Sequence, residues 1–345
     1  MTADDHRYML RACQLAHLGL GNTSPNPHVG AVIVADGRII GEGSHRKIGE
    51  GHAEVNAIRS VKPEDRDLLK QSTMYVTLEP CSHFGKTPPC ARLIVETGIP
   101  RVVIASADPS PKVNGKGIAI LREAGVDVEV MDNDLTVLAD NENRAFRSPY
   151  INNRPLITLK WAQSADGFMA GKNGKPVKFS TPLTSTLVHK LRSEHDVILT
   201  TAATVNADNP LLDCRLWKAG RAPRIAVVDR WGTVNPDSSI FSHVATKPLV
   251  YTETAEMVDG AEMVRLSPCN PEAILADMMK RGYNSVLVEA GPTYLSALID
   301  SGLYDTIRVE TAPIALGDDG SKAAPALPGA PHETFEIESN QIHII

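Results

Sequence analysis

Two short stretches of the sequence carry side chains that could bind and use a metal ion. The stretch GHAEVNAI contains His52 and Glu54. The stretch TLEPCSHFGKTPPC contains Cys81 and Cys90. One imidazole and two thiolates form the borderline-soft ligand set that suits zinc. A structural zinc closes its shell with four protein ligands, whereas a catalytic zinc keeps three and an open position. With His83 as a fourth ligand the site would be structural, so both kinds of site stay open at this point.

Glu54 favours the catalytic alternative. It lies two residues after His52, at the start of a predicted helix whose first turn can aim both side chains at one point. Zinc lowers the pKa of water from about 16 to about 7, and a neighbouring carboxylate can carry the released proton to a leaving group. His-x-Glu followed by Pro-Cys and a second cysteine is typical of zinc nucleobase deaminases. The sequence therefore predicts a catalytic zinc held by His52, Cys81 and Cys90.

The loop between the two cysteines departs from the commoner deaminase pattern. Eight residues, SHFGKTPP, intervene where two are usual. This loop, with SPNPHVGAVIV and GEGSHRKIGEGHAE before it, resembles the deaminase half of the bifunctional riboflavin-biosynthesis enzyme over about residues 6–130. The resemblance implies that the substrate is a pyrimidine ribosylamine phosphate and that Glu54 is catalytic. It also implies that the substrate is bound by Asn26, His45, His83, Lys86 and Asp108.

The second half of the chain shows weaker chemical signals. Lys160 lies on a predicted strand, and a later strand runs into Ala290-Gly291-Pro292 before a helix. Free backbone N–H groups beyond such a strand suit a phosphate. In order and spacing these segments resemble the reductase half of the same bifunctional enzyme, a dihydrofolate-reductase-like domain that uses NADPH, over about residues 150–320.

This second resemblance implies roles for a larger set of residues. Lys160 would orient or polarise the ribose carbon that receives hydride. Arginines suit the ribose phosphate because a guanidinium binds phosphate oxygens in pairs. The substrate would be bordered by Pro176, Arg192, Leu212, Arg215 and Glu289. The cofactor would be bordered by Ala162, Lys178, Thr204, Asp208, Arg230, Gly291, Pro292, Thr293, Tyr294, Leu295, Ser296 and Ala297.

The second half also departs from the family in two places. In KPVKFSTP, Pro176 and Lys178 occupy the positions of a substrate-binding serine and a cofactor-binding tryptophan. Arg230 stands where a small polar residue often follows the strand aspartate. We expect Arg230 to pair with the 2′-phosphate of NADPH, which would offset stacking lost at Lys178. These differences bear on cofactor affinity more than on the type of reaction.

The elements that must position these residues alternate between helices and strands. Apolar residues at helical spacing predict a first helix, and Asp36-Gly37 predicts a tight hairpin between two strands. Short helices and buried strands then alternate, which predicts crossover connections and a mostly parallel or mixed sheet covered on both faces. Gly115-x-Gly117 lacks the third glycine of a dinucleotide fingerprint and is interpreted as a helix start. A second alternating series ends in TFEIESNQIHII, which we expect to form one closing strand.

The chain is thus predicted to be an α/β protein of two domains. The resemblance implies a cytidine-deaminase-like three-layer α/β/α domain followed by a dihydrofolate-reductase-like α/β domain. The stretch NENRAFRSPYINNRP is polar, contains two prolines and lacks periodicity, which places the boundary near residue 148. We expect a zinc-dependent pyrimidine deaminase domain at 1–147 and an NADPH-dependent reductase domain at 148–345.

The bulk composition limits the partners. A net charge of −6 gives no sign of a basic surface that would bind a nucleic acid. No apolar run is long enough to span a membrane. Five cysteines without disulfide spacing, and an N-terminus without signal-peptide features, favour reduced thiols in the cytoplasm. We expect a small phosphorylated pyrimidine as partner, zinc and NADPH as cofactors, and a homo-oligomer. The alternatives are a nucleic-acid base deaminase with an accessory binding domain, and a non-catalytic protein with a structural zinc.

Overall fold

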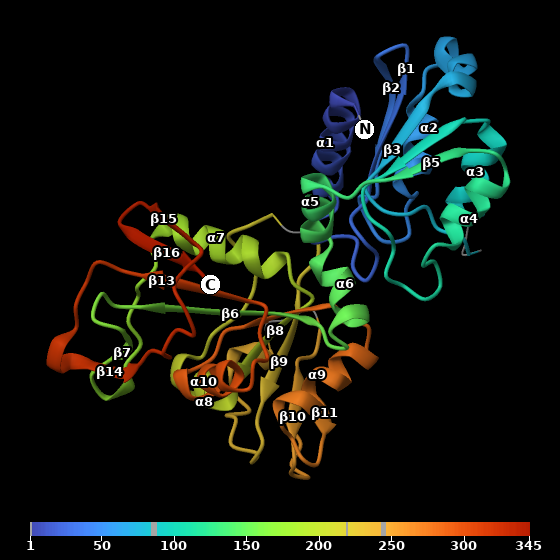
Figure 1. The fold of residues 1–345 in the computed structure, drawn as a ribbon. Coiled ribbons are helices and arrows are strands. Elements are labelled where there is room, and N and C mark those ends of the chain that lie inside the picture. The colour runs from blue at the N-terminus through green and yellow to red at the C-terminus, as the bar shows by residue number, and fades with distance from the viewer. Residues whose placement is uncertain (1, 84–87, 219, 243–245) are drawn as a thin grey trace. The chain divides into compact units, whose positions relative to one another are not determined.

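The structure, a computed structural model, describes residues 2–83, 88–218, 220–242 and 246–345 (Figure 1). The chain forms two compact units, Met1–Asn153 and Arg154–Ile345. This division comes a few residues after the expected boundary at 147/148. The boundary segment, expected to be irregular, instead contains helix α6 (Arg144–Ile151), which has Pro149 inside it.

The first unit is built around a five-stranded mixed sheet with the order β2-β1-β3-β4-β5. Strand β1 is antiparallel to both β2 and β3, and β3, β4 and β5 are parallel. Asp36 and Gly37 both have positive φ in the β1–β2 turn, as the Asp-Gly signal predicted. The strands are β1 (Gly30–Ala35), β2 (Arg38–Ser44), β3 (Thr73–Val76), β4 (Arg101–Ile104) and β5 (Asp127–Val130).

Helices cover both faces of this sheet, which gives the three layers predicted. Buried side chains of α1 and α5 pack on one face, and those of α2, α3 and α4 pack on the other (Figure 1). The α-helices besides α6 are α1 (Ala3–Ala16), α2 (Ala53–Ser60), α3 (Cys90–Thr97), α4 (Lys116–Glu123) and α5 (Asp134–Glu142). The 3-10 segments are His17–Gly19 and Pro63–Gln71.

The second unit contains a nine-stranded sheet with the order β11-β10-β9-β8-β12-β6-β13-β16-β15. The strands from β11 to β13 are parallel, and β16 and β15 are added antiparallel. The expected single closing strand is wrong, because the tail folds back on itself as a hairpin. The strands are β6 (Leu156–Gln163), β8 (Val197–Thr201), β9 (Arg224–Val228), β10 (Leu249–Thr252), β11 (Glu262–Arg265), β12 (Ser285–Val288), β13 (Thr306–Thr311), β15 (Glu333–Ile337) and β16 (Asn340–Ile344).

Both faces of this sheet carry apolar clusters, and one of them also holds buried charged side chains. One face packs its apolar side chains against α9 and α10. On the other face the in-register residues Lys160 and Arg308 carry buried charges, and the segment after α7 contributes His195, whose Nε2 lies 2.9 Å from Thr158 Oγ1. The helices are α7 (Pro182–Ser193), α8 (Ala202–Asp208), α9 (Pro271–Lys280) and α10 (Pro292–Asp300).

A separate two-stranded sheet is formed by β7 (Phe168–Gly171) and β14 (Gly320–Ala323). These strands pair antiparallel although about 150 residues of sequence separate Gly171 from Gly320. We call β7, β14 and the 3-10 turn Lys172–Gly174 the flap. The described helices include none that is long and apolar enough to cross a membrane.

Candidate active sites

The three predicted metal ligands of the first unit come together in space. His52 directly precedes α2, Cys81 follows β3, and Cys90 begins α3. His52 Nδ1 lies 3.6 Å from Cys81 Sγ and 3.4 Å from Cys90 Sγ. All three ligand atoms lie within 4.8 Å of one another. Hydrogen bonds from Cys90 and His52 lower the pKa of the Cys81 thiol, which favours the thiolate that metals bind. This donor set and spacing fit a zinc ion.

Glu54 lies beside this cluster in the first turn of α2. Its carboxyl group is almost completely buried, with 3% of the residue exposed. Burial raises the pKa of Glu54 to about 7. The side chain also lines a cavity of about 330 Å³ that contains His52 and Cys81. The predicted carboxylate is therefore adjacent to both the metal ligands and the space where a substrate would bind.

Asn26 and His45 form a hydrogen-bonded pair on the wall of the same cavity. His45 Nδ1 lies 3.1 Å from the Gly51 carbonyl oxygen, which can only accept, so this nitrogen carries the proton. His45 Nε2 then accepts from Asn26 Nδ2 at 3.2 Å. Burial lowers the pKa of His45, which keeps the imidazole neutral. Both residues line the cavity, so the structure brings these predicted substrate residues together with Glu54.

The other predicted substrate residues of this half are placed as follows. Asp108 is buried and lines the cavity, and burial raises the pKa of its carboxyl group. His83 lines the cavity as well and is exposed to solvent. Lys86 lies outside the described residues. Among the residues that the structure describes, the cluster of side chains able to hold a metal does not include His83. Three ligands beside a cavity therefore favour the catalytic alternative.

Glu79, between β3 and Cys81, was not singled out from the sequence. Its carboxylate accepts backbone hydrogen bonds at 2.9 Å from both Gly115 and Gly117, at the start of α4. A Cβ atom at Gly117 would collide with the carbonyl oxygen of Pro80. Glu79 therefore fixes the loop that carries Asp108, and the glycine pair is a helix start, as interpreted.

Two aromatic side chains of α6 also line this cavity and were not predicted. The rings of Phe146 and Tyr150 meet edge to face with centroids 5.5 Å apart. They escaped prediction because the sequence around Pro149 was interpreted as an irregular linker. An apolar aromatic wall opposite polar groups suits the flat ring of a nucleobase.

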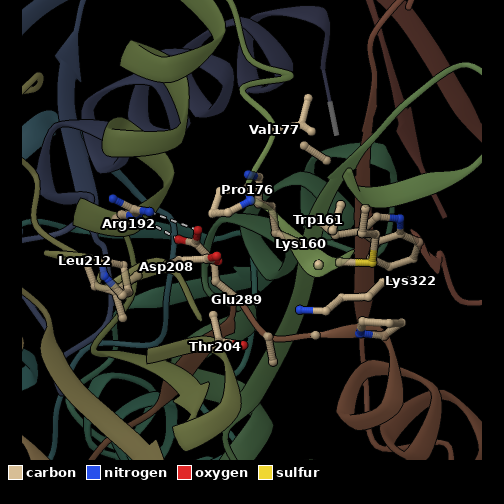
Figure 2. A pocket seen from close by; sticks show the side chains of 18 residues that line it. Lys160, Trp161, Pro176, Val177, Arg192, Thr204, Asp208, Leu212, Glu289 and Lys322 are labelled. Carbon is tan, nitrogen blue, oxygen red and sulfur yellow. Dashed lines mark hydrogen bonds and ion pairs between the residues drawn. The ribbon is translucent and has the colours of Figure 1, made fainter. Parts of the chain in front are cut away.

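The second unit contains a cavity of about 260 Å³ above the end of β6. Figure 2 shows side chains from β6, α7, α8 and the flap directed into it. The predicted residues that line it are Lys160, Ala162, Pro176, Arg192, Thr204, Asp208, Leu212, Glu289, Gly291 and Pro292. Most residues expected to border substrate or cofactor are thus gathered at one place.

Glu289 and Arg192 form the strongest charge pair of this cavity. The guanidinium donates from Nε to Oε1 at 2.6 Å and from Nη2 to Oε2 at 2.9 Å (Figure 2). Burial alone would raise the pKa of Glu289, but Arg192 outweighs it and lowers the pKa to about 2. Arg192 also donates to the Asp213 carbonyl oxygen at 3.1 Å, next to Leu212, whose φ of 50° is rare for a leucine. The pair holds this wall in one arrangement.

Lys160 is buried on β6, with 9% of the residue exposed. Burial lowers the pKa of its ammonium group, and the carboxylates of Glu289 and Glu310 oppose this effect. Glu310 is itself held by hydrogen bonds from Ser180 at 2.9 Å and Asn340 at 2.6 Å. The lysine therefore points from the sheet into the cavity with a fixed electrostatic environment, rather than into solvent.

The wall formed by α8 and α10 combines backbone donors at a helix start with the carboxylate of Asp208. Gly291 is the N-cap of α10, and no side chain caps this helix. Pro292 has no N–H, and the N–H groups of Tyr294 and Leu295 donate to the Gly291 carbonyl oxygen, so among the described residues only Gly291 and Thr293 leave an N–H of this helix start for a ligand. Thr204 and Asp208 line the cavity from α8. Beyond Pro292, the predicted residues continue along α10, and the side chain of Leu295 lies in the apolar core instead of the cavity.

Besides residues 293–297 of α10, three more predicted residues lie apart from the described lining of this cavity. Lys178 is exposed, although its neighbour Val177 lines the cavity. Arg215 is exposed and forms an ion pair with Asp213 at 2.6 Å. Arg230 pairs with Glu253 at 2.9 Å, and its guanidinium lies 4.5 Å from the centre of the Trp231 ring.

Other lining residues were missed by the sequence analysis. They were not named as binding residues, although Ala290 belongs to the Ala-Gly-Pro turn singled out above, and they are Trp161, Met169, Ala170, Gly174, Val177, Pro210, Ala290 and Lys322. The helix start at Gly291 and the cations Lys160, Arg192 and Lys322 in this lining suit phosphate groups, such as those of a dinucleotide or a phosphorylated substrate.

Comparison with known families matches each unit separately. Residues 2–106 match the cytidine and deoxycytidylate deaminase zinc-binding region, and residues 155–340 match the RibD C-terminal domain. The riboflavin biosynthesis protein RibD of Bacillus amyloliquefaciens is 38% identical over 321 residues, with 90% of this chain and 85% of that protein covered. RibD of Escherichia coli is 37% identical over 347 residues, with 94% and 92% covered.

Solved structures give the same result. A RibD structure from Acinetobacter baumannii is 30% identical with a TM-score of 0.88 and covers 99% of this chain and 98% of its own. A diaminohydroxyphosphoribosylaminopyrimidine deaminase/5-amino-6-(5-phosphoribosylamino)uracil reductase from Thermotoga maritima is 35% identical with a TM-score of 0.88, with the same coverage.

Proposed function

The chain belongs to the RibD family and is a bifunctional deaminase and reductase of riboflavin biosynthesis, and from this premise we propose which of its residues perform each reaction. The first unit carries the zinc-dependent deaminase, and the second carries the NADPH-dependent reductase. The predicted substrates are 2,5-diamino-6-ribosylamino-4(3H)-pyrimidinone 5′-phosphate and then its deaminated product.

In the deaminase, His52, Cys81 and Cys90 would hold the zinc ion. Zinc at this position supplies the Lewis acidity that makes water nucleophilic at neutral pH. Glu54 would accept a proton from the attacking water and deliver it to the departing amino group. This role of Glu54 is supported by the burial of its carboxyl group beside the cavity, where few water molecules compete for the proton.

The remaining groups of that cavity would select the pyrimidine. Asn26 and the neutral His45 offer a donor and acceptor pair to the edge of the ring, and Phe146 and Tyr150 offer an apolar surface to its face. His83, Asp108 and Lys86 complete the proposed substrate set. Lys86 would meet the phosphate because an ammonium group is a strong phosphate partner.

In the reductase, Lys160 would contact the sugar oxygen while hydride is added to the neighbouring carbon. NADPH supplies that hydride. Arg192, held by Glu289, would keep the substrate wall in place with Pro176, Leu212 and Arg215. The cofactor would lie along Ala162, Thr204, Asp208 and residues 291–297, with Lys178 and Arg230 at its outer parts.

The observation that carries this assignment is the grouping of Glu54 with a three-ligand metal cluster at one cavity. The test is to incubate the purified protein with the diaminopyrimidine phosphate, with and without NADPH, and to analyse the products by mass spectrometry. Without NADPH we expect exchange of one amino group for oxygen. With NADPH we expect the same product to gain two hydrogens, and an unchanged substrate would contradict the proposal.

We also propose that the protein is cytoplasmic and forms a homo-oligomer. The five cysteines are free thiols, which supports a reducing compartment and hence the cytoplasm. The net charge of −6 disfavours the alternative of a nucleic-acid base deaminase. Heparin retention at low salt would support that alternative. The homo-oligomer stays a prediction, which sedimentation equilibrium would check.

A further inference from the structure

Lys322 adds a cation to the reductase cavity that neither reaction above uses. It lies on β14, and Figure 2 shows its side chain pointing into the cavity. Of the other lining cations, Arg192 is bonded to Glu289, and Lys160 is buried between carboxylates. Lys322 is exposed, and among the described residues its ammonium group forms no hydrogen bond or ion pair with another side chain. Its ammonium group can therefore donate hydrogen bonds to a ligand.

The backbone at Lys322 is held in an unusual conformation. Its φ of 57° lies in the left-handed region, which is unfavourable for a residue with a side chain. Strand pairing fixes both neighbours, because Ser321 is in register with Ala170 and Ala323 with Phe168. Strained residues of this kind cluster at ligand-binding positions when the surrounding structure enforces them. The flap thus presents one particular side chain to the cavity.

The contacts of Lys322 place its charge near the α8 side of the cavity. A Cβ atom at Gly174 would lie 3.5 Å from Lys322 Cε and 3.8 Å from Nζ, so the side chain extends along the flap turn. Burial raises the pKa of Asp208 on α8, and the Lys322 ammonium group opposes this effect. Asp208, Gly291 and Lys322 line one cavity, so the ammonium group and the helix start at Gly291 face the same space.

We propose that Lys322 binds a phosphate group of a ligand in this cavity and thereby sets the affinity of the reductase for that ligand. This inference rests on the reductase function proposed above. Two ligands carry such a group: the dinucleotide, through the diphosphate that NADPH and NADH share, and the substrate, through its ribose phosphate. Removal of the charge should weaken binding about tenfold, the size expected for one charge-assisted hydrogen bond to phosphate.

The experiment compares Lys322→Met with the wild type in the full-length protein. The Kd of NADPH and of NADH is measured by energy transfer from tryptophan, since Trp161 lines the cavity, and the KM of the phosphorylated substrate is measured separately. Lys322→Arg keeps the charge and should restore affinity. Lys175→Met removes a charge from an exposed residue directly after the flap turn and outside the described lining, and it should change nothing. Lys322→Gly removes the backbone strain, so it should bind weakly while unfolding at no lower urea concentration.

The two dinucleotide Kd values and the substrate KM together distinguish which phosphate Lys322 binds. Equal weakening of NADPH and NADH, with a shallower salt dependence of Kd, would assign Lys322 to the diphosphate. A raised substrate KM with unchanged dinucleotide Kd would assign it to the ribose phosphate. If Lys322→Met matches the wild type in all three measurements, the inference is wrong. A wild-type protein that binds neither dinucleotide would instead contradict the proposed reductase function.

Discussion

Arg192 on α7 and Glu289 at the end of β12 meet through two parallel hydrogen bonds of 2.6 and 2.9 Å, inside the cavity that lies beside Lys160. Both side chains are largely buried, with 13% of each exposed. A buried pair of this kind contributes little net stability compared with an apolar pair, but loss of one partner leaves a charge without compensation. The ion pair therefore links the stability of the second unit to the geometry of its cavity.

Arg192→Met should destabilise the second unit by about 3–5 kcal/mol, because the buried Glu289 carboxylate would lose its partner. Lys190→Met is the matched control on the same helix, since Lys190 forms a more exposed pair with Glu194, and it should cost less than about 1 kcal/mol. Urea unfolding followed by tryptophan fluorescence measures this unit alone, because Trp161, Trp217 and Trp231 all belong to it. An equal loss of unfolding free energy in the two variants would show that the buried pair has no special role in stability.

The same pair predicts a dependence of stability on pH. The pKa of Glu289 falls from an ordinary 4.5 to about 2 on folding, because the effect of Arg192 exceeds that of burial. A lowered pKa gives stability that is complete above pH 4.5 and is lost as the pH falls towards 2, here about 3 kcal/mol in total. The stability difference between wild type and Glu289→Gln should therefore shrink between pH 6 and pH 3. A constant difference across this range would contradict the prediction.

Cys90→Ala should lose stoichiometric zinc, because two remaining ligands bind the ion much more weakly. Cys13→Ala is the control, since Cys13 is buried in α1, belongs to the same unit and lies outside the metal cluster. Zinc content measured by mass spectrometry after gel filtration should be close to one per chain in the control and far lower in Cys90→Ala. Full zinc content in both variants would move the ligand assignment to another residue.

Arg230→Ser should lower the preference for NADPH over NADH about tenfold, because NADH has no 2′-phosphate for a guanidinium to bind. In the structure Arg230 pairs with Glu253, so cofactor binding would exchange one partner for another. Arg265→Ser, at an exposed arginine of β11, is the control. The ratio of kcat/KM for the two cofactors is the measurement, and an unchanged ratio in Arg230→Ser would remove this residue from the cofactor site.

The metal site was predictable because each ligand lies in or directly beside a helix or strand with a clear sequence pattern. His52 precedes α2, and Cys90 begins α3, while Cys81 follows a buried strand, so correct placement of these elements brings the ligands together. The Asp36-Gly37 hairpin and the crossover order were predictable for the same reason: local turn chemistry and apolar periodicity agree with the fold. The reductase residues followed from family resemblance rather than from local pattern.

The structural features that the sequence did not predict depend on contacts that leave no local sequence pattern. Helix α6 was interpreted as a linker because it contains Pro149, which normally disfavours a helix interior. The β15–β16 turn has Glu338 at a φ of 55°, where glycine or asparagine would have signalled a hairpin. Lys322 lies on a short polar strand whose partner, β7, is far away in sequence. Nothing in a single sequence shows such a pairing.

The central claim is that Glu54 is the proton carrier of a deaminase whose active site is separate from that of the reductase. The most direct test is Glu54→Gln, with Glu50→Gln as a control at an exposed carboxylate of the preceding loop. Zinc content, deamination of the diaminopyrimidine phosphate and reduction of the supplied deaminated intermediate are measured on the same preparations. We expect Glu54→Gln to keep zinc and reductase activity while deamination falls about a thousandfold, because the amide cannot carry the proton. Deamination by Glu54→Gln at a rate close to that of the control would contradict the account.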